Sequence, residues 1–295
     1  MPAVDFKALF IEERERRRKQ QQQSEQEAAG GSATPHSNVA AKDSHHTKSA
    51  EAPPCVLAPR RPLVLTDFEI AKQFGVRGLH YIPDFITEEE EQSILQGVYA
   101  DGTEQRWVQC GNRRVQNWGG KPGDAMVTED LPPFAAALVD AVITSGVCDE
   151  NTSPNHVLVN EYNQPAGITP HNDGALYAPH VAIVTLSGSA LMDFWPTEGP
   201  AVEDDSNDPE APQPLTQVML RPRSLLLYQG GAYGLRHGIR NAAVDQVSAR
   251  CANVDDLIGG GAYVNIGDAV ARGARRQSVV FVRKGLNHAS LPASD

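Results

Sequence analysis

The sequence has little of several features that mark particular classes of protein. No apolar run approaches the roughly 18 residues needed to cross a bilayer, and the first residues do not form a cationic and then apolar secretion signal. The cysteines stand singly, without a Cys-x-x-Cys pair, at positions 55, 110, 148 and 251. This spacing argues against a disulfide framework or a zinc knot. We therefore expect a monomeric protein of the nucleus, the cytoplasm or both, with no membrane association.

Aromatic residues and basic charge are also scarce. Aromatics make up 6% of the 295 residues, and 26 Lys and Arg face 37 Asp and Glu, for a formal charge of −11. This balance excludes a protein that coats nucleic acid by bulk attraction, although it permits a local basic groove. The chain is rich in Gly and Pro, with 25 and 21 residues, which favours a turn-rich β protein over a helical bundle.

Composition divides the chain near residue 61. Residues 6–27 are charged and helix-capable, and the interleaved glutamates favour a solvated helix over a nuclear-import signal. Residues 30–59 contain almost no large apolar side chains, so burial cannot offset the entropy cost of ordering them. We predict a disordered or partly helical low-complexity tail over residues 1–61 and one folded domain over residues 62–295.

Periodicity in the folded part predicts a mainly β, α+β protein. Thr87 and Glu90 form a capping box for a helix over 88–97, and 131–143 has the pattern of a second helix. Strand patterns cover 80–85, 156–162, 181–187, 190–195, 216–221, 224–229 and 276–283. Helices followed by many short strands suggest a β-sandwich or barrel backed by helices. Residues 197–214 and 241–274 lack such a pattern, and we expect both to be flexible insertions.

One group of residues suggests a metal site. In an extended chain His171 and Asp173 point the same way, and His237 follows a later strand. Two histidines and one carboxylate are the donor set of non-haem Fe(II) oxygenases. A His-x-Asp sequence alone carries little weight, because roughly 0.6 such matches are expected here by chance counting. The pattern gains weight from the ordered residues around it.

These ordered residues resemble the AlkB family of Fe(II)- and 2-oxoglutarate-dependent dioxygenases. The motifs are Asn160-x-Tyr162, His171-x-Asp173, His237-Gly238 and Arg276-x-Ser278, with Gly167 between the first two. Two further stretches, 114–120 and 173–177, are most similar to the sixth-homologue branch of the family in animals and plants. The resemblance covers residues 78–285. It implies a double-stranded β-helix, or jelly roll, with supporting N-terminal helices.

The resemblance also implies a role for each motif residue. His171, Asp173 and His237 would hold Fe(II), with 2-oxoglutarate and O2 as co-substrates. The guanidinium of Arg276 would bind the distal carboxylate of 2-oxoglutarate, helped by Tyr162 and Ser278, while Asn160 would reach the C1 end. Oxidative decarboxylation of 2-oxoglutarate to succinate and CO2 would accompany removal of hydrogen from a substrate C–H bond.

The chain departs from the family pattern at one position. The family has a second arginine six residues after the first, where this sequence has Val282 followed by Arg283. Because side chains alternate along a strand, Arg283 is expected to point away from the site unless a bulge intervenes. We expect either weaker co-substrate binding or another group in this role.

The substrate is less well defined by the sequence. Residues 105–123 hold four cations, no acid and two tryptophans, a composition suited to phosphate contact and base stacking. We predict a substrate lid for single-stranded or flipped-base DNA or RNA that uses Arg113, Arg114, Asn117, Trp118 and Tyr177. The predicted activity is oxidative demethylation of an alkylated base. Alternatives are that the tryptophans anchor the core, that the substrate is a protein, or that the chain is a weakly active nucleic-acid-binding pseudoenzyme.

Overall fold

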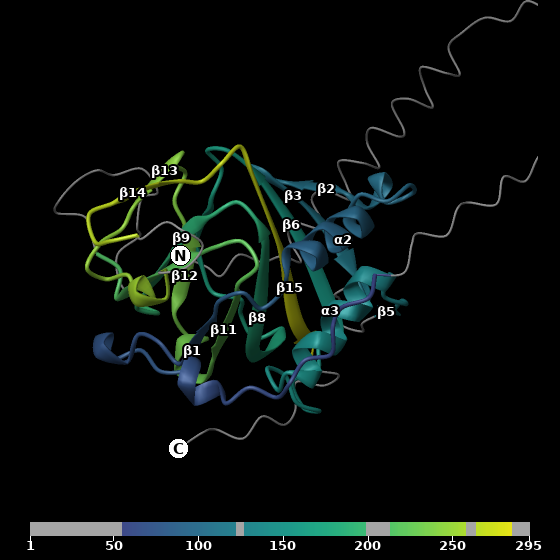
Figure 1. Ribbon diagram of the computed structural model, residues 1–295, viewed down its shortest axis with the longest axis horizontal. Helices are drawn as coiled ribbons and strands as arrows, with labels where there is room; N and C mark the ends of the chain where they lie inside the picture. The colour runs from purple at the N-terminus through teal and green to yellow at the C-terminus, as the bar shows by residue number, and fades with distance from the viewer. Residues whose placement is uncertain (1–54, 122–126, 199–212, 258–263, 285–295) are drawn as a thin grey trace, which may run out of the picture. The chain divides into compact units, whose positions relative to one another are not determined.

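The computed structural model describes residues 55–121, 127–198, 213–257 and 264–284 (Figure 1). Within these ranges the α-helices are α2 (Glu88–Val98) and α3 (Pro133–Thr144), close to the predicted ranges. Helix α2 begins at the predicted capping box, in which the Glu90 N–H donates to Thr87 Oγ1 and the Thr87 N–H donates to Glu90 Oε2. Short 3-10 helices lie at Leu65–Phe68, Lys72–Phe74, Glu104–Arg106, Gly230–Ala232 and Val254–Leu257.

Seven antiparallel strands form the larger sheet, in the order β1-β11-β8-β15-β6-β3-β2. They are β1 (Leu79–Ile82), β2 (Val108–Cys110), β3 (Arg113–Trp118), β6 (His156–Asn163), β8 (Tyr177–Ser187), β11 (Leu225–Gln229) and β15 (Arg275–Lys284). The sequence predicts five of these strands. It does not predict the hairpin of β2 and β3, which lies inside the proposed lid segment.

Four strands form the smaller sheet, in the order β10-β9-β12-β7. They are β7 (Ile168–His171), β9 (Ala190–Trp195), β10 (Thr216–Leu220) and β12 (Arg236–Ile239). Two short pairs lie outside these sheets, β4 (Gly120–Lys121) with β5 (Val127–Thr128), and β13 (Val244–Gln246) with β14 (Ala269–Ala271).

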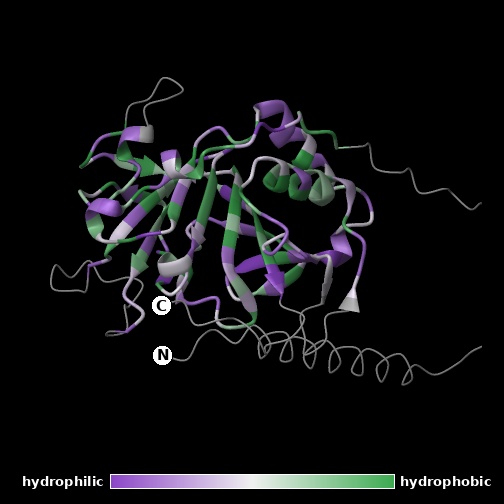
Figure 2. Ribbon diagram, turned by 90° about the horizontal axis from the view of Figure 1, so that it is seen from below, coloured by the Kyte–Doolittle hydropathy of each residue, from purple (hydrophilic) through white to green (hydrophobic). Residues whose placement is uncertain are grey.

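The two main sheets enclose an apolar layer that makes them a jelly roll, as predicted. Val181, Leu226 and Val282 of the larger sheet join Met192, Phe194 and Val218 of the smaller sheet in one buried cluster. Figure 2 shows hydrophobic residues concentrated along the central strands. Burial between two facing sheets is the main stabilising term in such a fold, at roughly 25 cal/mol per Å² of apolar surface.

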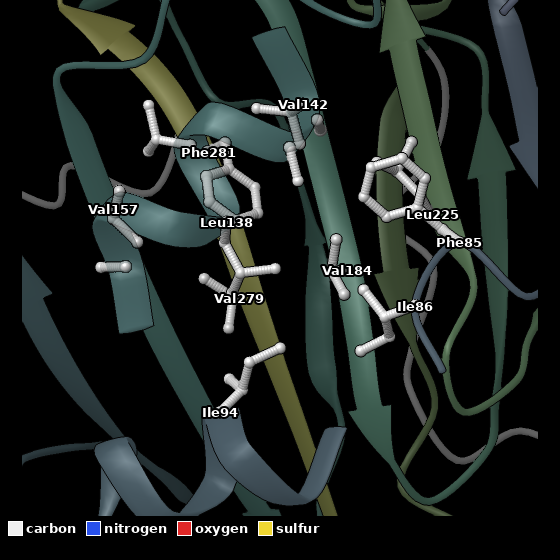
Figure 3. Close-up of a cluster of buried hydrophobic side chains, with 14 of the residues drawn as sticks. Phe85, Ile86, Ile94, Leu138, Val142, Val157, Val184, Leu225, Val279 and Phe281 are labelled. Carbon is white, nitrogen blue, oxygen red and sulfur yellow. The ribbon is translucent and has the colours of Figure 1, made fainter. Parts of the chain in front are cut away.

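Helices α2 and α3 cover the outer face of the larger sheet. Val279 and Phe281 of β15 point toward these helices and pack with Ile94 and Leu138 (Figure 3). Val282, on the same strand, points into the layer between the sheets. The alternation of side chains along β15 therefore separates a helix-covered face from a face that looks into the jelly roll.

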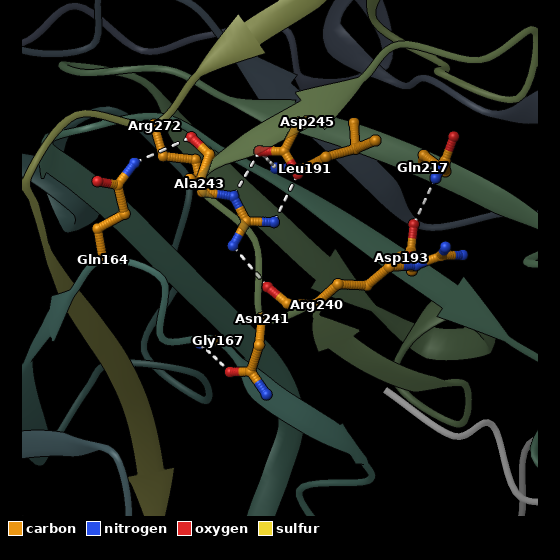
Figure 4. Close-up of polar contacts among 10 residues, drawn as sticks. All are labelled: Gln164, Gly167, Leu191, Asp193, Gln217, Arg240, Asn241, Ala243, Asp245 and Arg272. Carbon is orange, nitrogen blue, oxygen red and sulfur yellow. Dashed lines mark hydrogen bonds and ion pairs between the residues drawn. The ribbon is translucent and has the colours of Figure 1, made fainter. Parts of the chain in front are cut away.

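The described parts of residues 241–274 form a packed cover rather than the flexible insertion that we predict from the sequence. Val247 and Cys251 pack on Leu191 and Met219, on the outer face of the smaller sheet. Sequence periodicity does not indicate this packing, because the segment buries polar groups in place of a periodic apolar face. Its contacts include Arg272 to Asp245 and Asp245 to the Leu191 N–H (Figure 4). Asn253 also bonds to the backbone of Met219.

Residues 55–61 also pack against the domain, so the fold begins before the boundary that composition suggests at residue 61. Cys55 is buried in the core below α2. The Ala58 N–H donates to Glu90 Oε1 over 2.8 Å, and the Arg60 guanidinium pairs with the same carboxylate at 2.6 Å. Composition misses this segment because its contacts are polar and long-range. Residues 1–54 and 199–212 lie outside the described residues.

No helix in the described part of the chain is long and apolar enough to span a membrane.

Candidate active site

The predicted metal ligands come together in the structure. His171 ends β7, Asp173 follows it, and His237 lies in β12. One ligand atom from each residue lies within 4.8 Å of the other two. His171 and His237 are Cα partners in the β7–β12 pair, and the centroids of their rings are 4.6 Å apart. Two imidazoles and one carboxylate with this arrangement fit an Fe(II) ion and leave room for further ligands.

Two glycines allow β7 and β12 to approach closely enough to form this cluster. A Cβ atom on Gly167 would lie 2.0 Å from the carbonyl oxygen of Ile239, and one on Gly238 would lie 2.8 Å from that of Ile168. Neither position can hold a larger residue without moving the backbone. Glycine is therefore required at these two motif positions for steric reasons, since it permits the strand pairing that places His171 beside His237.

Hydrogen bonds orient the ligand side chains. His171 Nδ1 lies 2.8 Å from the carbonyl oxygen of Thr169, which fixes the tautomer that leaves Nε2 without a proton. Burial, with His237 nearby, lowers the pKa of His171 to about 4, so the ring is neutral at physiological pH. Tyr228 donates its hydroxyl to Asp173 Oδ2 over 2.7 Å.

Tyr228 is a site residue that the sequence analysis does not identify. It lies in β11, is fully buried, and its hydroxyl is also 3.4 Å from His237 Nε2. Burial first, and then the charge of Asp173, raises its pKa well above the usual value for tyrosine, so it remains a hydrogen-bond donor. The sequence feature that could have identified Tyr228 is its hydroxyl at the end of the apolar run 225–228.

Arg276 is buried, and no acidic partner for it lies among the described residues. Its Nη1 is 3.3 Å from Ser278 Oγ and its Nη2 is 3.2 Å from Thr185 Oγ1, while Nε has no hydrogen-bond partner among them. Burial lowers its pKa to about 10, which still leaves it charged at neutral pH. A buried cation without a counter-ion is costly unless an anion binds it. Arg276 is therefore suited to bind a carboxylate.

The other predicted co-substrate residues share a face with Arg276. In the β15–β6 pair, Arg276 is opposite Tyr162 and Ser278 is opposite Asn160. The Arg276 guanidinium lies over the ring of Tyr162, 5.8 Å from its centroid. A small pocket beside Arg276 is lined by residues from both sheets, among them Tyr162, Ala190 and Ile239. Thr185, which sequence reasoning misses, completes the polar surroundings of Arg276.

Val282 and Arg283 lie on opposite faces of β15. Val282 is buried in the layer between the sheets, whereas Arg283 donates from Nη1 to the carbonyl oxygen of Ser153 over 2.8 Å. The pairing of β15 with β8 shifts register between Val282 and Lys284, yet Arg283 keeps the outward direction that alternation predicts. It does not replace the missing arginine.

The residues predicted to form a substrate lid divide between two faces of β3. Trp118 is 7% exposed, packs edge-on against Phe134 in the helix-covered core, and donates its indole N–H to Gln116. It is a core anchor, and the prediction that it stacks on a base is wrong. Asn117 points to the other face, where its Oδ1 lies 3.1 Å from His156 Nε2, and Tyr177 lies 3.1 Å from His156 Nδ1.

The basic charge of the segment 105–123 is largely paired with acids from elsewhere. Arg106 pairs with Glu129 at 3.0 Å and Arg114 with the buried Glu161 at 2.5 Å. The guanidinium of Arg114 also stacks over Trp107, 4.4 Å from the ring centroid. A sequence window overstates the basic character because it does not include these partners. Trp107 and Arg114 are both half-buried, and Trp107 also packs against the helix-covered core.

The jelly roll, the His-x-Asp and His cluster, and the buried arginine together define a class of enzyme. The class is the Fe(II)- and 2-oxoglutarate-dependent dioxygenases, which are oxidoreductases.

Comparisons with known proteins give the family within this class. No family model matches the chain. The chain is 37% identical over 199 residues to a protein of Danio rerio described as "Probable RNA/DNA demethylase ALKBH6", which covers 67% of this chain and 82% of the relative. It is 27% identical over 202 residues to the "Alkylated DNA repair protein ALKBH8 homolog" of Arabidopsis thaliana, covering 63% of this chain and 56% of that protein. The chain belongs to the AlkB family.

A search of solved structures finds similarity to one titled "The structure of OsALKBH1". It has a TM-score of 0.41 and 15% identity, and the match covers 70% of this chain and 96% of that one.

Proposed function

We propose that this enzyme removes alkyl groups from bases in single-stranded or flipped-out nucleic acid, with Fe(II) held by His171, Asp173 and His237. The observation that carries the proposal is the buried cluster of these three side chains, whose ligand atoms lie within 4.8 Å of one another. When bound, iron and 2-oxoglutarate supply the oxidising power that inserts one oxygen atom of O2 into a substrate C–H bond.

The surrounding residues hold and orient the reactants. Arg276 would bind the distal carboxylate of 2-oxoglutarate through its two Nη groups, because these face Ser278 and Thr185 and meet no acid among the described residues. Tyr162 lies against this guanidinium, and Asn160 lies on the same face one pair further along. Tyr228 would keep Asp173 in position through the hydroxyl hydrogen bond. The apolar layer between the sheets excludes water from the site.

Two observations support nucleic acid as the substrate class. The names of both relatives refer to nucleic acid, as a demethylase or a repair protein. In this chain, Trp107 and Arg114 form a stacked aromatic and cationic pair, with 37% of the Arg114 side chain exposed. Such a pair can stack on a base and contact a phosphate. Asn117, His156 and Tyr177 form a connected polar group on the inner face. One chain supplies all these residues, which supports a monomer. We further propose that the protein acts in the nucleus or the cytoplasm.

The test is demethylation of a defined strand. The full chain would be incubated with Fe(II), 2-oxoglutarate and short single-stranded DNA or RNA that carries one N-methylated base, with the unmethylated strand as control. Mass spectrometry should show loss of the methyl group, with one succinate and one formaldehyde formed for each methyl removed. Asp173→Ala should form neither product.

Two outcomes separate the parts of the proposal. Succinate formation with methylated peptides but with neither strand would contradict the substrate class and leave the reaction class in place. Absence of succinate with every substrate, at a level equal to Asp173→Ala, would contradict the reaction class.

A further inference from the structure

Arg113 is a second buried arginine that lies on the same face of the larger sheet as Arg276. In the β3–β6 pair Arg113 is opposite Tyr162, and in the β15–β6 pair Arg276 is opposite the same tyrosine. Directly opposed residues in antiparallel strands share a face, so the three side chains form one row across β3, β6 and β15. The guanidinium carbons of Arg113 and Arg276 lie 5.9 and 5.8 Å from the centroid of the Tyr162 ring.

The alternation along β3 gives Arg113 a different environment from its neighbour. Arg114 is on the helix-covered face, where it pairs with Glu161. Arg113 is 9% exposed, and its guanidinium has no hydrogen bond or ion pair with any described residue. It also lies close enough to His171 for its charge to oppose protonation of that ring, behind the larger effects of burial and His237. Arg113 is therefore a buried member of the row that contains Arg276, within electrostatic range of His171, and does not lie on the outer surface of the lid.

Two buried cations in one row, without an acid among the described residues, require an anion to balance them. The penalty for a buried unpaired charge is several kcal/mol. 2-Oxoglutarate carries two carboxylates, and Arg276 would take one of them. The chain has Val282 where the family has its second arginine, so the strand that carries Arg276 supplies no second guanidinium to this face.

From this arrangement we infer that Arg113, on β3, supplies the second cationic contact for 2-oxoglutarate in place of the residue at 282. The inference rests on the proposed co-substrate role of Arg276. It assigns Arg113 to the co-substrate and not to a phosphate of the nucleic acid. The contact comes from β3, which is separated from β15 by β6 in the same sheet, so the residue spacing along β15 cannot reveal it.

The experiment compares binding of 2-oxoglutarate to the full chain and its variants by calorimetry, without oxygen and with Mn(II) in place of Fe(II). Arg113→Met should weaken 2-oxoglutarate binding by about tenfold or more, since a hydrogen bond to a charged group is lost. Arg113→Lys should recover part of the affinity because it restores the charge without the planar fork. Arg283→Met, on the opposite face of β15, is the matched control and should bind as wild type does.

Thermal melts separate a binding role from a packing role. Because Arg113 makes no hydrogen bond or ion pair with the described residues, Arg113→Met should melt at the same temperature as wild type or higher without ligands, whereas 2-oxoglutarate should raise its melting temperature less than that of wild type. A packing role would lower the melting temperature of the ligand-free variant and leave the ligand-induced rise unchanged.

Further variants decide between outcomes. Unchanged 2-oxoglutarate binding in Arg113→Met, together with weaker binding in Arg276→Ala, would overturn the assignment of Arg113 and leave the proposed function intact. Lys284 is another buried cation whose Nζ has no hydrogen-bond partner among the described residues. If Lys284→Met weakens 2-oxoglutarate binding and Arg113→Met does not, the assignment of Arg113 is also overturned. Loss of oligonucleotide binding alone in Arg113→Met would assign the residue to a phosphate instead. Wild-type protein that binds no 2-oxoglutarate would contradict the proposed function itself.

Discussion

His171 and His237 are direct partners across the β7–β12 pair, with ring centroids 4.6 Å apart. The metal cluster therefore depends on the register of two short strands at one edge of the smaller sheet. A shift of one residue would turn one of the two rings to the other face. The close approach at Gly167 and Gly238 acts on this edge, and the Gly167 N–H donates to Asn241 Oδ1 over 2.8 Å.

Binding of 2-oxoglutarate should require both the charge and the planar shape of the Arg276 guanidinium. Arg276→Lys keeps a charge but cannot donate from two coplanar nitrogens, so affinity for 2-oxoglutarate should fall, and Arg276→Ala should lower it further. Metal binding should remain in both variants because Arg276 is not a ligand. Calorimetric titration with 2-oxoglutarate at saturating Mn(II) measures this. Wild-type affinity in both variants would place the carboxylate anchor elsewhere.

The two tryptophans of the segment 105–123 should respond differently to truncation. Trp118→Ala removes a buried core side chain and should destabilise the fold by about 3–5 kcal/mol. Trp107→Ala should leave the fold largely intact and weaken binding of single-stranded nucleic acid, because base stacking is worth about 1–3 kcal/mol. Urea unfolding and fluorescence anisotropy at two salt concentrations measure the two effects. Equal strand binding by Trp107→Ala and wild type would contradict the lid.

The ion pair of Arg272 and Asp245 should stabilise the cover over the smaller sheet. Arg272 Nε lies 2.7 Å from Asp245 Oδ2, and both side chains are 6% exposed. Arg272→Met leaves a buried carboxylate unpaired and should cost about 3–5 kcal/mol in the free energy of unfolding. The double variant Arg272→Met with Asp245→Leu should regain only part of that loss, because the buried Leu191 N–H then loses its acceptor. Urea unfolding that shows no loss for the single variant would mean that the pair contributes little.

His156 should make the metal-free protein less stable in mild acid. Burial first, and then the charge of Lys284, lowers its pKa to about 4, against about 6.5 in an unfolded chain. Between these values the unfolded chain binds a proton that the folded chain excludes, so stability falls as the pH falls from about 6.5 toward 4.

The contribution of His156 between pH 7 and pH 5 is about 2 kcal/mol. Urea unfolding at the two pH values should therefore show a smaller loss for His156→Gln than for wild type. Equal losses in the two proteins would show that His156 is not the group responsible.

The sequence predicts the fold where local patterns decide it. Alternating apolar residues locate β6, β8, β9, β11 and β15, and the Thr87 and Glu90 box locates the start of α2. It does not locate the contacts that depend on distant partners. Arg60 with Glu90, Arg114 with Glu161 and Arg272 with Asp245 each join segments far apart in the chain. For that reason the domain start, the charge of the lid and the order of residues 241–274 differ from expectation.

In the candidate site, too, residues in sequence motifs are predicted from the sequence, whereas residues brought in by distant contacts are not. The metal residues are recognisable because their motifs are ordered along the chain, and the structure places them together. Tyr228 and Thr185 carry no motif, and only the packing of β11 and β8 brings them to Asp173 and Arg276. Arg113 is noticed as a cation in the sequence, but its direction depends on the register of β3 with β6.

The most direct test of the account is an anaerobic titration of the full chain with Fe(II), comparing wild type with Asp173→Ala. Asp173 supplies the only carboxylate in the cluster, so its loss should weaken Fe(II) binding by at least about tenfold, the scale found even for groups that merely support a ligand. Asp173→Asn is the matched control for shape, and it should also bind weakly because it lacks the charge. Fe(II) binding that is the same in Asp173→Ala as in wild type would contradict the assignment of His171, Asp173 and His237 as the iron site.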